Sequence, residues 1–125
     1  MSEHPIKGID VHTFAVKDAA RATAFWRDVM GLTPAQTSER GAEFALPDGS
    51  YFELWQPEDG DLSHGLMFAV DDLSQAVAYY RSKGVNIVGE QETPVCRMAF
   101  AADSEGNHFV LHQRKDGTAG NDRAR

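Results

Sequence analysis

The chain has 125 residues, of which 42% are hydrophobic and 25% charged, as in an ordinary globular protein of one domain. Its net charge of −7 disfavours a nucleic-acid partner and leaves no basic surface for binding a membrane. No apolar run is long enough to cross a bilayer and no signal-peptide pattern is present, so we expect a cytoplasmic protein. The one cysteine, Cys96, excludes a disulfide within the chain.

The first half of the chain predicts one strand, one helix and three further strands. Residues 6–16 alternate as a strand does, and Asp18 is placed to cap the helix that follows. One apolar face of this helix is formed at helical spacing by Ala22, Phe25, Trp26, Val29 and Met30. Gly31 is placed to end the helix, and short strands are expected over residues 32–38, 42–46 and 50–56.

The strand over residues 50–56 has two different faces. Phe52 and Leu54 lie on one face, while Glu53 lies between two large aromatic residues on the other, Tyr51 and Trp55. A carboxylate in that position belongs either to a solvated edge or to the floor of a binding site. If the site is desolvated, we expect the pKa of Glu53 to rise.

The second half of the chain repeats the first. Residues 48–56 align without a gap on residues 105–113, with the turn, the apolar face and the closing Gln kept. Residues 14–18 reappear as residues 68–72, so that Asp72 takes the capping position of a second helix. Gly84 is placed to end that helix, and strands are expected near residues 85–90, 96–101 and 107–113.

The repeat predicts an α+β fold of two βαβββ modules that form a curved mixed sheet around a concave groove, with the helices outside. The expected divisions are residues 1–57 for the first module, 58–64 for a linker, 65–114 for the second module and 115–125 for a disordered tail. One short module cannot bury its own apolar face, so the two should share a core. We expect the following side chains under the helices: Phe52, Leu54, Leu66, Phe68, Val70, Phe109 and Leu111.

The organisation resembles the vicinal oxygen chelate superfamily, which contains glyoxalase I, bleomycin resistance proteins and extradiol dioxygenases. Residues 24–32, Ala-Phe-Trp-Arg-Asp-Val-Met-Gly-Leu, are similar to the family motif A-F-Y-R-D-V-L-G-L. Residues 103–107, Asp-Ser-Glu-Gly-Asn, are similar to D-P-D-G-N, and the resemblance covers residues 6–113. It implies that enzymes of this kind bind a divalent metal through four side chains, one on the first and one on the last strand of each module.

Only one of the four implied ligand positions holds a ligand residue, since these positions are Val11, Glu53, Gly65 and Val110. His12 and His64 each miss a ligand position by one residue, which in a strand means the opposite face. His108 and His112 share the face of Val110 but lie roughly 13 Å apart along a strand, too far to bind one ion together. We therefore expect no metal cofactor. If a divalent metal does bind, its ligands should be Glu53, His64 and His112.

Strand alternation predicts a ligand-binding groove lined by Val11, Thr13, Tyr51, Glu53, Trp55, Met67, His108, Val110 and His112. His12 should instead share the helix-covered face of Phe14 and Val16. We expect a homodimer as well, because the core is modest and the sheet has open edges. The sequence leaves open whether the modules pair within a chain or exchange between subunits.

Three functions agree with this pattern. The first is a metal-free module that binds a small aromatic or cationic molecule in the groove. The second is a metal-dependent lyase, isomerase or dioxygenase acting on a substrate with vicinal oxygens. The third is a metal-free enzyme in which Glu53 transfers a proton, assisted by His108 or His112. We favour the first, with Glu53 as the catalytic residue if the protein is an enzyme.

Overall fold

The structure is a computed structural model that describes residues 4–120. It contains one mixed sheet of eight strands, in the order β2-β3-β4-β1-β5-β8-β7-β6, and two α-helices. The elements are β1 (Ile6–Ala15), α1 (Ala19–Ala24), β2 (Gln36–Ser38), β3 (Gly41–Ala45), β4 (Tyr51–Trp55), β5 (His64–Val70), α2 (Leu73–Ser82), β6 (Asn86–Glu92), β7 (Cys96–Ala102) and β8 (His108–Arg114). The α+β fold of two βαβββ modules predicted from the repeat is confirmed. No helix within residues 4–120 is long and apolar enough to span a membrane.

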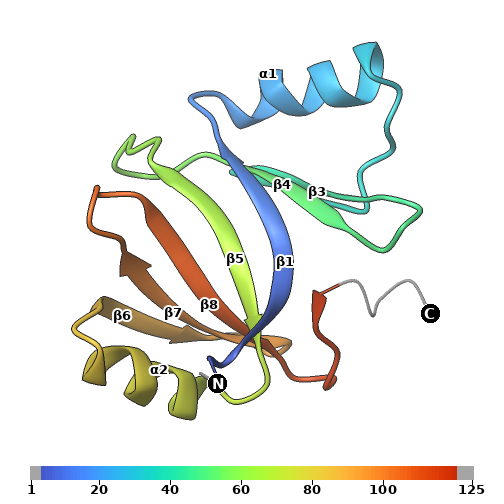
Figure 1. Ribbon diagram of the computed structural model, residues 1–125. Helices are drawn as coiled ribbons and strands as arrows, with labels where there is room; N and C mark the ends of the chain where they lie inside the picture. Colours follow the sequence, from blue (N-terminus) through green and yellow to red (C-terminus); the bar gives the residue numbers. More distant parts are fainter. Residues whose placement is uncertain (1–3, 121–125) are drawn as a thin grey trace.

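The two modules meet in the middle of the sheet, where β1 pairs with β5 in the antiparallel direction (Figure 1). Each module also pairs its first strand with its last in parallel, β1 with β4 and β5 with β8. The modules are therefore joined edge to edge within one chain. One helix packs at each end of the curved sheet, α1 beside β3 and β4 and α2 beside β6, β7 and β8.

The glutamine that closes the last strand of each module caps the helix of the same module. The Gln56 side-chain oxygen accepts a hydrogen bond from the Ala19 backbone N–H at 2.9 Å, and Gln113 does the same for Leu73 at 2.8 Å. Each helix also has an aspartate N-cap, as predicted. The repeated Gln thus satisfies a free N–H of a helix N-terminus and ties the helix to the sheet.

The apolar face predicted for the first helix is only partly buried. After α1 the chain continues as a wider π-helical turn, η1 (Phe25–Val29), so the regular helical spacing is lost. Trp26 packs against the core, as expected, but Val29 is 70% exposed and Met30 52% exposed. Phe25 is exposed as well, at 47%. The prediction of one continuous buried stripe is therefore wrong.

The core consists of two clusters, one under each helix, and not of a single shared one. Phe44 and Leu54 centre the first cluster, and Val70, Ala99 and Leu111 centre the second. Phe52 and Phe68 pack against these clusters as expected. Leu66, which follows the register shift between His64 and Leu66 in the pairing of β5 with β8, is not in either buried cluster and is only partly buried.

The segment after β8 packs against β1 as far as the structure describes it. The Gly120 N–H donates to the Asp10 carboxylate at 2.7 Å, and the Arg114 guanidinium donates to the Gly120 carbonyl oxygen at 2.7 Å. Residues 115–120 of the predicted disordered tail therefore have defined partners. The remainder of that prediction, residues 121–125, lies outside the described residues.

Candidate functional site

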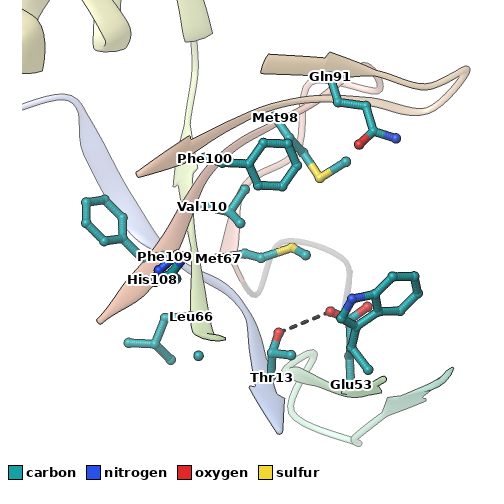
Figure 2. Close-up of a pocket in the computed structure, with 12 residues that line it drawn as sticks. Thr13, Glu53, Leu66, Met67, Gln91, Met98, Phe100, His108, Phe109 and Val110 are labelled. Atoms are coloured by element: carbon teal, nitrogen blue, oxygen red, sulfur yellow. Dashed lines mark hydrogen bonds between the residues drawn. The ribbon is translucent and has the colours of Figure 1, made fainter. Parts of the chain in front are cut away.

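A cavity of about 320 Å³ lies on the face of the sheet opposite the helices. Strand alternation explains this placement, because Leu111 packs under α2 while its neighbour Val110 faces the cavity. The cavity spans both modules and is lined by Thr13, Glu53, Trp55, Gly65, Leu66, Met67, Gln91, Met98, Phe100, His108, Phe109 and Val110. Figure 2 shows Met67, Met98 and Phe100 gathered on the side of the cavity across from Glu53.

Glu53 is the only carboxylate among the residues that line this cavity. The Thr13 hydroxyl donates a hydrogen bond to its Oε1 at 3.1 Å (Figure 2). The pKa of Glu53 is raised from 4.5 to about 7; burial is the largest cause, and the charge of Glu43 on the adjacent strand acts in the same direction. The Thr13 hydrogen bond and the charge of His112 act in the opposite direction. The predicted rise in the pKa of Glu53 therefore has desolvation as its main cause.

Most of the remaining cavity wall is apolar. It is formed by two methionines, Met67 and Met98, together with Phe100 and Val110. Trp55 lies at the margin, with 38% of its surface exposed. An apolar cavity of this size with one strong hydrogen-bonding group is typical of a small-molecule site.

His108 lies at the edge of the cavity, 3.6 Å from the Asp61 carboxylate through Nε2. Its side chain is partly exposed, at 36%. It therefore lies between the cavity and the outer surface near residues 61–63.

His112 belongs to a buried polar network and does not line the cavity. Its Nδ1 is 2.7 Å from the Asp10 carboxylate. The same carboxylate forms an ion pair with the Arg114 guanidinium at 2.6 Å. Asp10 is 2% exposed and lies at an irregularity in the register of β1 and β5, between Ile9 and Val11. A bulge redirects side chains locally and has no clear sequence signal here, so this partnership is not predictable from strand alternation.

Six of the nine residues predicted for the groove line the cavity: Thr13, Glu53, Trp55, Met67, His108 and Val110. Val11 is buried within the sheet, with 5% exposed. Tyr51, the first residue of β4, lines a separate hollow beside Lys7 and Gly120. His12 is exposed and lines that same hollow, so it is not a helix-covered core residue.

Three further lining residues, Gln91, Met98 and Phe100, were missed by the sequence interpretation. Gly65 was named there only as an implied ligand position, and Leu66 and Phe109 were assigned to the core. Met98 and Phe100 could have been found, because they alternate on the predicted strand over residues 96–101. Their partners across the sheet, His112 and Val110, were already placed on the groove face. Leu66 and Gly65 lie where the register of β5 is irregular, which the sequence does not indicate.

The donor atoms present do not fit a metal at the position that the family uses. The alignment with the family motifs puts Val11, Gly65 and Val110 at three of the four implied positions, and none of them offers a side-chain ligand. Within the described residues, no three His, Cys, Asp or Glu side chains come close enough to hold one ion. His112 is engaged by Asp10, and the side chain of His64 lies outside the described part of the structure. We therefore derive no chemistry through a metal.

The sequence matches the Glyoxalase/Bleomycin resistance protein/Dioxygenase superfamily over residues 8–111. The chain therefore belongs to this superfamily, as the motifs predicted. No curated protein sequence matches it significantly.

Several solved structures share the fold. Methylmalonyl-CoA epimerase from Mycobacterium tuberculosis is similar with a TM-score of 0.74 and 20% identity, covering 90% of this chain and 91% of that one. The Streptomyces coelicolor epimerase, solved with 2-nitronate-propionyl-CoA, has a TM-score of 0.73 and 20% identity over 91% and 99% of the chains. A structure described as an NAD-dependent benzaldehyde dehydrogenase from Legionella pneumophila has a TM-score of 0.63 and 20% identity, over 84% and 98%. Similarity at this level of identity establishes the fold alone.

Proposed function

We propose that this protein binds a small aromatic or cationic molecule in the cavity above Glu53, without a metal. The observation that carries the proposal is a single carboxyl group, Glu53, hydrogen-bonded to Thr13 in an otherwise largely apolar cavity. Such a group orients a ligand through one hydrogen bond while the apolar wall supplies most of the binding free energy. The donor set described above supports the metal-free function over the metal-dependent one.

The charge of the lining supports a ligand without negative charge. No lysine or arginine is among the residues that line the cavity, and Glu53 is its one acidic residue. An ammonium group beside Glu53 would stabilise the carboxylate that burial otherwise disfavours. Trp55 and Phe100 offer aromatic faces, which attract both rings and cations.

Isothermal titration calorimetry with phenethylamine, phenethyl alcohol and phenylacetate tests this proposal. We expect the amine and the alcohol to bind and the carboxylate to bind weakest. Glu53→Gln and Trp55→Ala should each weaken amine binding about tenfold. His12→Ala is the matched control, because His12 does not line the cavity, and it should leave affinity unchanged. A loss of binding in His12→Ala alone would contradict the proposed site.

Proton transfer by Glu53 is a second candidate function, favoured by one specific observation. Its pKa of about 7 is close to the pH at which a general acid or base is most effective. As a base, the carboxylate would take a proton from the carbon next to a carbonyl group of a bound ligand. NMR of phenylacetone in D₂O would detect this as exchange of that proton, which Glu53→Gln should abolish. Exchange at the same rate in Glu53→Gln would rule this function out.

We also propose that the protein forms a homodimer through the exposed apolar residues of the first module. Phe14 is 55% exposed, and Phe25, Val29 and Met30, which lie in η1 or directly after it, are exposed as well. Apolar patches of this kind often mark interaction surfaces. Light scattering should report a dimer for the wild type and a monomer for Val29→Glu. Val88→Glu, at a position 61% exposed on β6, is the control that should stay dimeric.

A further inference from the structure

The cavity above Glu53 has a second polar group at its rim, the side-chain amide of Gln91. Gln91 lies on the edge strand β6, directly opposite Met98 in the antiparallel pairing of β6 with β7. Residues opposite each other in such a pair carry their side chains on the same face of the sheet. The Gln91 side chain therefore shares the cavity face with Met98, which also lines the cavity.

Glu53 and Gln91 lie at opposite ends of the cavity. Glu53 is on β4 in the first module, whereas Gln91 is on the edge strand of the second module. The strands between them carry Met67 and Met98, and Figure 2 shows both methionines between the Glu53 and Gln91 side chains. The cavity thus has a carboxyl group at one end, an amide at the other and an apolar middle.

The Gln91 amide is available to a ligand. Gln91 is exposed, and no hydrogen bond to another group within residues 4–120 occupies its side chain. By comparison, the hydroxyl of Thr13, another polar lining residue, already donates to Glu53. An amide both donates and accepts hydrogen bonds, so it can pair with a hydroxyl or a carbonyl group.

We propose that Gln91 binds the far end of the ligand, and that the ligand is an aromatic amine with a hydroxyl or another uncharged polar group opposite its amino end. This rests on the proposed function, since the amino end lies beside Glu53 in the same cavity. The ring packs against Met67 and Met98, whose thioethers make favourable contacts with aromatic rings. An anionic group at the far end has no cationic partner, because no lysine or arginine lines the cavity.

Calorimetric titration with phenethylamine and tyramine tests this contact, because the two amines differ only in a hydroxyl group at the far end of the ring. The wild type should bind tyramine about three- to tenfold tighter, the usual gain from one uncharged hydrogen bond. Gln91→Leu should bind the two amines equally, and so should Gln91→Ala. Each variant is judged by the ratio of its two affinities, so any effect of the substitution on the part that both probes share cancels.

Gln36→Leu is the matched control for these variants. Gln36 is also an exposed glutamine on an edge strand, β2, and it lines a smaller hollow and not the cavity. This variant should keep the advantage of tyramine over phenethylamine.

The outcomes separate this inference from the function on which it rests. Equal binding of both amines to the wild type would overturn the inference, because no residue would then recognise the far end of the ring. An advantage of tyramine that survives in the Gln91 variants would overturn it as well, because another residue would then bind the hydroxyl group. If neither amine binds the wild type, the proposed function itself fails, and this inference fails with it.

Discussion

We expect the folding stability of the wild type to fall as the pH rises, because Glu53 must lose its buried proton. Glu53→Gln should not show this fall. The pKa of Glu53 is about 7 in the folded chain and 4.5 without burial. Between these values the folded chain keeps a proton that the unfolded chain has released, so folding stability falls as the pH increases. The stabilisation that this proton gives the folded chain is complete below about pH 4.5 and is lost as the pH rises through about 7. This difference in the pKa of Glu53 between the folded and the unfolded chain corresponds to at most about 3 kcal/mol in the free energy of unfolding.

Urea denaturation followed by circular dichroism, at about pH 5 and about pH 8, measures this effect. The free energy of unfolding of Glu53→Gln, relative to that of the wild type, should be higher at about pH 8 than at about pH 5, by up to about 3 kcal/mol. Glu58→Gln, at an exposed position in the loop after β4, is the control and should show no such gain. If the difference between Glu53→Gln and the wild type is the same at both pH values, Glu53 is not desolvated and our account of the cavity is wrong.

Three further substitutions follow from the hydrogen bonds. Thr13→Val should raise the pKa of Glu53 further, because it removes the hydroxyl that donates to the carboxylate at 3.1 Å; NMR titration of the Glu53 side chain would show it. Asp10→Asn should lower the free energy of unfolding by about 3 kcal/mol, because it removes the negative charge from a buried pair with Arg114; urea denaturation measures this. Gln113→Ala should cost about 1 kcal/mol in the same assay, because it removes the hydrogen bond that caps α2.

Each of these substitutions has a matched control. Thr13→Ser keeps the hydroxyl and should leave the pKa of Glu53 near that of the wild type. Asp71→Asn changes an exposed aspartate before α2 and should have little effect on stability. Gln113→Glu keeps an acceptor for the helix N–H and should cost less than Gln113→Ala. An equal effect of the control and the test variant would contradict the role assigned to that hydrogen bond.

The sequence was sufficient to predict the fold because its signals are local and occur twice. Asp18 and Asp72 cap the two helices, and Gln56 and Gln113 close the two repeated strands. Strand alternation also placed Glu53 and most of its neighbours on the cavity face. These features depend on backbone geometry that a short stretch of sequence specifies.

The remaining features depend on irregular geometry that no sequence pattern indicated. The register shift at Asp10 directs its carboxylate to His112, which the regular alternation had placed in the groove. A second shift, at the start of β5, lies beside Leu66, which was expected in the core and is only partly buried. The π-helical turn leaves Val29 exposed.

The claim that this site binds its ligand without a metal is tested most directly by titrating phenethylamine into protein treated with a chelator and then dialysed. We predict the same affinity before and after chelation and after zinc is added back, with the same loss in Glu53→Gln throughout. Binding that disappears on chelation and returns with zinc would contradict the account, because a metal would then be completing a site that the described side chains do not form.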